Sequence, residues 1–210
     1  MQIKSLDLSP DGKCFAASGS RKLVLHDLAS GQELWNYDKL DNSDNVTAVR
    51  FAADGASLFA AGDELRCVEV RTGRRLWSVR NQKNNRTFLV QALGISPRGD
   101  TLLYYDQEAL KRLDIASQTV TPLQLGRQLG QVKFISFSPD GRLALIGGDF
   151  VLLLIDVMAA NVAFEFRVKH DSLLSAGAIA PDGNLAAVAG TYSASVFVYD
   201  LGGLKAEGAA

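Results

Sequence analysis

The sequence predicts an all-β protein, a β-propeller of about five four-stranded blades in which the last blade is incomplete. Three observations lead to this fold class: a turn motif that recurs along the chain, an acidic residue that ends a strand at a regular distance after each turn, and strand-length apolar segments between them. No amphipathic stretch with the 3.6-residue period of a helix has a useful length, so almost no helix is expected.

The recurring turn motif has four residues and always ends in glycine. Proline presets φ, aspartate bonds the backbone ahead and glycine accepts a positive φ, so each copy is expected to form a tight turn. The glycines stand 43, 44, 42 and 42 residues apart. The copies are Ser9-Pro10-Asp11-Gly12, Ala52-Ala53-Asp54-Gly55, Ser96-Pro97-Arg98-Gly99, Ser138-Pro139-Asp140-Gly141 and Ala180-Pro181-Asp182-Gly183.

Two further kinds of residue, here called anchors, recur at a regular distance after the turn motif. An acidic residue closes an apolar run 14 to 17 residues after each turn glycine. Gly31 and Gly73 follow it in two repeats, with Gln118 and Asn161 at or next to the matching place. A period near 43 residues with four short strands per period is typical of a propeller. The acidic anchors are Asp27, Glu69, Asp114, Asp156 and Asp200.

The fourth repeat shows the strand pattern most clearly. Its strands are expected at Val132 to Ser138, Leu143 to Gly147, Val151 to Val157 and Val162 to Val168. By the same pattern, residues 1–201 form a single domain with a flexible tail at 202–210. The repeats are placed at about 3–44, 45–87, 88–130, 131–173 and 174–201.

The fifth repeat offers three strands, and the glycine- and alanine-rich tail is a poor fourth strand. Three arrangements follow from this. The chain closes as an unlatched five-bladed ring, forms part of a longer ring, or associates with a second copy through its open ends. An open propeller exposes a sheet face and a strand edge, so we expect association with a partner or a second copy there.

The turn motif after an apolar strand, followed by an aspartate that ends the third strand, resembles the WD-repeat family over residues 3 to 201. In place of the family's Trp-Asp pair the chain keeps the acid and replaces the tryptophan. The resemblance implies a propeller that works as a binding platform. The pairs are His26-Asp27, Val68-Glu69, Leu113-Asp114, Ile155-Asp156 and Tyr199-Asp200.

A second resemblance concerns two segments that end in Gly-x-x-Leu-Trp. Leu28 to Trp35 and Val70 to Trp77 are similar to the repeat ends of quinoproteins, which are also propellers. The alternative interpretation is that Trp35 and Trp77 are outer-strand residues that pack between adjacent blades.

Composition narrows the function classes. The net charge is −1, so neither a nucleic-acid nor a membrane partner is expected. No apolar run approaches the ~20 residues that span a bilayer, and no secretory leader is visible. The two cysteines, Cys14 and Cys67, do not make a disulfide framework, so the simplest expectation is a reduced, cytoplasmic protein.

No catalytic constellation emerges from the sequence, so no catalytic, cofactor-binding or metal-binding residue is predicted. His26 is expected to be a packed strand residue and His170 a loop or capping residue. The turn aspartates are expected to serve turn geometry, because their spacing and their proline and glycine neighbours fit that role. They are Asp11, Asp54, Asp140 and Asp182.

Two groups of charged loop residues are candidate partner-binding sites. Loops between the second and third strands carry acids, which a cation or a basic partner could use if they gather on one face. A basic segment around residues 66–86 includes arginines in the loop after the third strand, which could meet an anionic partner. The acids are Asp63, Glu64, Asp106, Glu108 and Asp149, and the arginines are Arg71, Arg74 and Arg75.

The sequence therefore predicts a non-catalytic, WD-repeat-like platform or scaffold subunit for protein–protein interaction. The alternative is a quinoprotein-like or lactonase-like propeller enzyme, or a fragment of one. That alternative needs convergent polar groups or a cation at the mouth of the channel.

Overall fold

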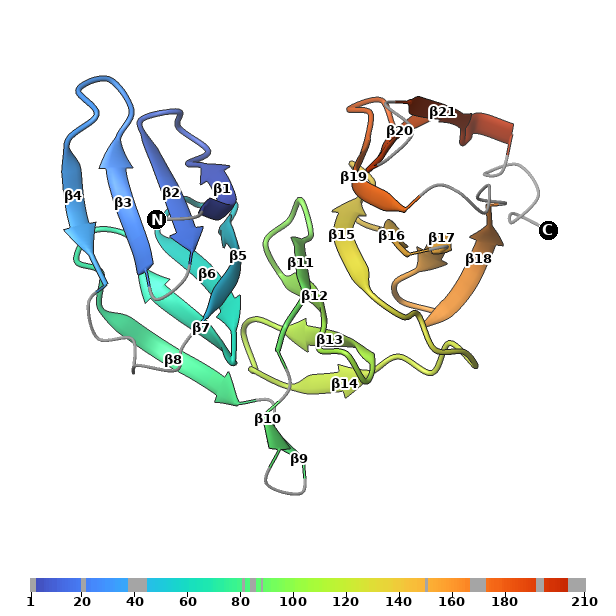
Figure 1. Cartoon of the computed structure of the whole chain (residues 1–210), viewed down its shortest axis with the longest axis horizontal. Coiled ribbons are helices and arrows are strands. Elements are labelled where there is room, and N and C mark those ends of the chain that lie inside the picture. The colour runs from blue at the N-terminus through green and yellow to red at the C-terminus, as the bar shows by residue number, and fades with distance from the viewer. Residues whose placement is uncertain are drawn as a thin grey trace. The chain divides into compact units, whose positions relative to one another are not determined.

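The computed structural model of the chain consists of antiparallel sheets, and it contains almost no helix (Figure 1). In every sheet of three or four strands, the strands follow one another in sequence order. By its internal contacts the chain divides into two compact units, Met1–Leu93 and Gly94–Ala210. The structure describes residues 3–19, 22–37, 45–80, 82–83, 86–87, 89–149, 151–166, 173–191 and 195–203.

The first unit contains two four-stranded sheets. The first sheet consists of β1 (Ile3–Leu8), β2 (Cys14–Gly19), β3 (Lys22–Asp27) and β4 (Glu33–Asn36). The second consists of β5 (Val46–Phe51), β6 (Ser57–Gly62), β7 (Glu64–Glu69) and β8 (Arg75–Arg80). A short hairpin, β9 (Gln82–Lys83) and β10 (Arg86–Thr87), follows β8 in the chain and is additional to the predicted strands.

The second unit contains the other three sheets. The third sheet consists of β11 (Ala92–Ile95), β12 (Thr101–Tyr105), β13 (Leu110–Asp114) and β14 (Val120–Pro122). The fourth consists of β15 (Val132–Phe137), β16 (Leu143–Gly148), β17 (Val151–Asp156) and β18 (Asn161–Glu165). The fifth has three strands among the described residues, β19 (Leu174–Ile179), β20 (Leu185–Gly190) and β21 (Val196–Asp200). The predicted all-β fold class, a propeller of five blades, is thus confirmed.

The sheets also repeat in their irregularities. The ladder between the first two strands shifts register near its start in the first, second, fourth and fifth sheets. A second shift lies between the third and fourth strands of the first, second and fourth sheets. Because a bulge bends a strand and increases its twist, bulges at matching places give the sheets the same local shape. The repeat is therefore structural as well as sequential.

The turns between the first and second strands are closed by side chains, as their composition predicts. In the first repeat, Ser9 Oγ donates to Asp11 Oδ1 at 2.7 Å, and Asp11 accepts the Lys13 amide at 3.1 Å. In the third repeat Arg98 takes the place of the aspartate. There Ser96 Oγ donates to Asp100 Oδ1 at 2.7 Å, so the carboxylate comes from two residues farther along. The predicted turn role of these acids is confirmed.

The turns between the third and fourth strands depend on the acidic anchors. Asp27 Oδ1 accepts the Ser30 amide at 2.8 Å and the Ser30 hydroxyl at 2.7 Å, and Asp114 accepts the same pair from Ser117. Each turn then needs one residue with positive φ. That residue is glycine in two repeats, whereas Gln118 and Ala160 adopt φ values of 57° and 55° in the other two.

These turn carboxylates lead to a prediction about acid stability. Hydrogen bonds from Ser30 and Ser117 lower the pKa of Asp27 and of Asp114 below the usual 3.8. Because the pKa is lower in the folded chain, this stabilisation is present above about pH 4 and is lost as the pH falls through the folded value. We expect the free energy of unfolding to decline below about pH 4, and to decline less steeply in the double variant Asp27→Asn/Asp114→Asn.

Urea midpoints measured between pH 2.5 and pH 7 test this expectation. Asp182→Asn is the matched control, because Asp182 occupies a turn and, among the described residues, accepts only the Asn184 amide, at 2.9 Å. An unchanged acid slope in the double variant would contradict the assignment.

The core of the first unit lies between its two sheets. Leu23 and Leu25 of β3 meet Val49 and Phe51 of β5, and all four side chains are buried. Consecutive sheets therefore pair two kinds of face. One face carries the third-strand residues two and four positions before the acidic anchor, as Leu25 and Leu23 do. The other carries the first-strand residues four and six positions before the turn glycine, as Phe51 and Val49 do.

The fourth and fifth sheets pack in the same way. They differ from the other sheets at two positions, where a bulky side chain and a small residue have changed places. The position six residues before the turn glycine is apolar and bulky in four repeats but is Gly177 in the fifth. The preceding position is small in four repeats but is Phe134 in the fourth. The Phe134 ring fills the space above Gly177 and above Gly147, where an added Cβ would lie 2.4 Å and 2.2 Å from ring atoms.

Candidate binding groove of the first two sheets

Trp35 on β4 joins the first sheet to the second. Its indole Nε1 donates to the Val70 carbonyl at 2.6 Å. Gly73, in the turn between β7 and β8, lies against the ring, because a Cβ added there would be 3.1 Å from an indole carbon. Trp35 therefore packs between two adjacent blades, as the sequence predicts. Trp77 contacts Phe59 within its own sheet, with ring centroids 5.9 Å apart and ring planes tilted by 48°.

A groove of about 540 Å³ opens beside Trp35. One side is the end of the first sheet, and the other is the β7–β8 turn of the second sheet. Its volume lies within the range of about 300–1,000 Å³ that is usual for ligand sites. The lining residues are Trp35, Asn36, Tyr37, Thr72, Gly73, Arg74 and Arg75.

The predicted arginines meet at this groove, and two of them line it. Arg74 forms no ion pair with any of the described residues, and Arg75 Nη1 lies 3.4 Å from Glu64 Oε1. Arg71 lies just outside the lining and makes a long ion pair of 3.9 Å with Glu69. The sequence identified these arginines as charges on a loop but gave no sign that they flank two aromatic residues.

Glu64 is not an exposed acid, which corrects one part of the predicted acidic face. It is buried, and Arg66 beside it is also buried. Glu64 Oε1 lies 2.6 Å from Arg66 Nε, and Glu64 Oε2 lies 3.4 Å from Arg80 Nε. This buried ion cluster neutralises the carboxylate and leaves nothing for a basic partner. The sequence did contain a signal: Glu64 and Arg66 stand two apart in a strand, on one face.

The other predicted acids do not form one charged surface. Asp106 is buried, and its carboxylate accepts the Lys111 ammonium and the Ala109 amide, the latter at 3.1 Å. Asp106 is therefore not an exposed acid, which corrects a second part of the predicted acidic face. Asp63 accepts the Asn45 amide at 3.1 Å. Asp149 is half-buried, and its Oδ1 has no hydrogen-bond partner among the described residues.

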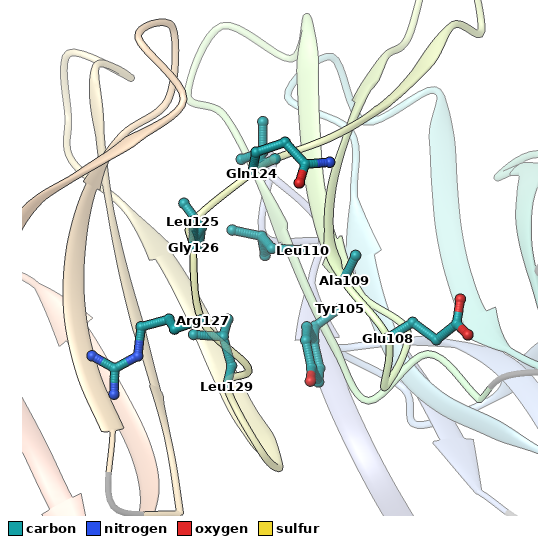
Figure 2. Close-up of a pocket in the computed structure, with 10 residues that line it drawn as sticks. Tyr105, Glu108, Ala109, Leu110, Gln124, Leu125, Gly126, Arg127 and Leu129 are labelled. Carbon is teal, nitrogen blue, oxygen red and sulfur yellow. The ribbon is translucent and has the colours of Figure 1, made fainter.

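Glu108 lines a smaller cavity of about 230 Å³ in the third sheet (Figure 2). Figure 2 shows Leu110, Leu129 and Tyr105 gathered around the space, with the charged ends of Glu108 and Arg127 pointing away from it on opposite sides. Arg127 forms an ion pair of 2.6 Å with Glu165. The charged ends of these two side chains therefore do not point into the cavity.

The side chains with possible reactivity lie in packed surroundings. Burial raises the pKa of both the Cys14 and the Cys67 thiols, which disfavours the nucleophilic thiolate. His26 stacks on Phe15 with ring centroids 4.9 Å apart, as expected for a packed strand residue. His170 lies outside the described residues. Among the described residues no three His, Cys, Asp or Glu side chains come together as metal ligands.

Five consecutive antiparallel sheets, each with its strands in sequence order, define the protein as a β-propeller. The match to a solved structure supports this class. A chain from Kuenenia stuttgartiensis Hydrazine Synthase superposes with a TM-score of 0.75 at 19% sequence identity, over 89% of this chain. This chain spans 55% of the length of that one. At this identity the likeness shows the fold.

No family model matches the sequence. The parts of the chain that the structure describes contain no helix that is long and apolar enough to cross a membrane.

Proposed function

We propose that the chain is a non-catalytic propeller subunit of the WD-repeat type, and that it works as a platform for protein–protein contact. The observation that carries this proposal is that the first and the fifth sheets each expose an apolar face of a kind that is buried elsewhere in the chain. Free thiols at Cys14 and Cys67 support a place in a reducing compartment, the cytoplasm.

The fifth sheet exposes the face that carries the third strand. Val196 and Val198 on β21 are 68% and 63% exposed. The matching residues of the fourth sheet, Leu152 and Leu154, are 0% and 1% exposed because they pack toward the fifth sheet. The apolar character of the position is thus kept in the fifth sheet, where these side chains are exposed.

The first sheet exposes the opposite kind of face. Leu6 and Leu8 on β1 are 51% and 52% exposed. Val49 and Phe51, which hold the same places in the second sheet, are buried against the first. Large contiguous apolar surfaces of this sort usually mark sites of protein interaction.

The two exposed faces are complementary in kind. Within each unit, the contact between the first and second sheets and that between the fourth and fifth sheets join a third-strand face to a first-strand face. The fifth sheet of one copy and the first sheet of another could therefore meet as consecutive blades do. Such a head-to-tail contact uses two different surfaces, one from each copy.

This proposal predicts that charge on the fifth sheet prevents association. The double variant Val196→Asp/Val198→Asp places two carboxylates in the contact, so we expect self-association at least tenfold weaker than in the native chain. Light scattering and sedimentation over a range of protein concentration give the mass.

Met158→Asp is the matched control, because Met158 is equally exposed but lies in the β17–β18 turn and not on the face. It is expected to associate like the native chain. A native chain that stays monomeric at every concentration, or a double variant with native association, would refute the proposed contact.

A further inference from the structure

We propose that the groove beside Trp35 binds an acidic peptide segment in an extended conformation. Its carboxylates would pair with Arg74 and Arg75, and its apolar side chains would lie on Trp35 and Tyr37. This site is separate from the exposed faces of the first and fifth sheets and does not depend on them.

The aromatic side of the groove is rigid before any ligand arrives. Trp35 is held by its bond to the Val70 carbonyl and by its contact with Gly73. The Tyr37 amide donates to the Leu23 carbonyl at 2.8 Å, which continues the β3–β4 pairing beyond the end of the sheet. The Tyr37 hydroxyl has no hydrogen-bond partner among the described residues, so it can donate to a ligand. A fixed aromatic surface loses little conformational entropy on binding.

The opposite side of the groove has excess positive charge. Around the β7–β8 hairpin stand five arginines and two glutamates. Glu64 is buried among its arginine partners, and Glu69 accepts the Thr72 hydroxyl and interacts with Arg71 and Arg74, which together lower its pKa. Glu33 on β4 is exposed but pairs in register with His26, on the sheet face opposite Trp35. The five arginines are Arg66, Arg71, Arg74, Arg75 and Arg80.

Arginine and aromatic residues together favour a peptide over a simple anion. A guanidinium binds a carboxylate through two parallel hydrogen bonds, and Arg74 makes no ion pair with the described residues, only a longer-range electrostatic interaction with Glu69. Inorganic phosphate would use the arginines but not the aromatic side. A nucleic acid would need a continuous basic track with open stacking faces, whereas Gly73 covers part of the Trp35 ring.

The test uses the full chain and a synthetic peptide of alternating glutamate and leucine. We expect saturable binding, seen by titration calorimetry and by a change in tryptophan emission. Arg74→Glu should weaken binding at least tenfold, and Arg74→Lys should keep part of the affinity. Circular dichroism checks that each variant folds, and Arg74→Gln serves if the glutamate variant does not.

Arg71→Glu is the matched control, because it changes the net charge by the same amount just outside the groove. It should weaken binding less than threefold. Three results would overturn the proposal: no peptide binding at millimolar concentration, equal losses in Arg71→Glu and Arg74→Glu, or displacement of the peptide by equimolar inorganic phosphate or single-stranded DNA.

Discussion

Replacing Glu64 by glutamine is expected to destabilise the first unit by about 3–5 kcal/mol, because it removes one partner of a buried ion pair. Arg66 would then keep its charge in the interior without the carboxylate that lies 2.6 Å from it. Glutamine has nearly the same shape as glutamate, so the loss reports on the charge and not on packing.

Tryptophan emission gives a direct measurement of this loss. The chain has two tryptophans, Trp35 and Trp77, and both belong to the first unit. Denaturant unfolding followed by this emission therefore reports on that unit, and far-UV circular dichroism reports on all sheets. Glu33→Gln is the control, since Glu33 is an exposed glutamate of the same unit. Its midpoint should match that of the native chain.

A double variant separates charge from position. Glu64→Leu alone removes the carboxylate that lies beside Arg66, whereas Glu64→Leu with Arg66→Leu replaces the pair by apolar side chains of similar size. Such replacements are often neutral or stabilising. We expect the double variant to unfold at a higher denaturant concentration than Glu64→Leu. If the single Glu64→Gln variant lost less than 1 kcal/mol, Glu64 and Arg66 would not form the pair described.

The second large effect is expected from Gly177→Ala, which should destabilise the second unit by about 1–3 kcal/mol through overpacking. The added methyl would lie 2.4 Å from Phe134 ring atoms, closer than any real contact. Relief would require the ring to leave its place over Gly147, which the surrounding buried residues oppose.

A compensating change tests the cause. Phe134→Leu alone should also destabilise the unit by leaving a cavity, but in combination with Gly177→Ala the two losses should not add. Hydrogen exchange of β15, β16, β19 and β20 together with circular dichroism gives the measurement. Gly203→Ala is the control, because a Cβ there meets nothing within 4 Å. Strictly additive losses would mean that the two side chains do not compete for one space.

Much of the fold could be predicted because turn chemistry is local. Gly12 and its counterparts need positive φ, and Asp27 and Asp114 bind amides only a few residues away, so these requirements are visible in the sequence. Strand length and apolar character then fix what lies between the turns. The β9–β10 hairpin escaped prediction because its residues carry no turn motif and no alternation.

The candidate site could be predicted only in part, because it depends on contacts between sheets. Arg71, Arg74 and Arg75 were visible as a basic loop, but their position beside Trp35 follows from the packing of the first sheet on the second. Glu64 and Asp106 were visible as loop acids, but their burial depends on partners brought in by neighbouring strands. Side-chain identity predicts charge, whereas its availability is a property of the packed structure.

The strand order in each sheet bears on how the chain acquires its structure. In every sheet of three or four strands, each strand pairs with the next one in the sequence. Strand pairing therefore requires only short loops to close. Hairpins of this kind form in roughly 1–10 μs, so several sheets can nucleate at once without a fixed order. The slow step is then expected to be the docking of preformed sheets, and mutations at the sheet-to-sheet contacts would change the folding rate more than mutations in the turns.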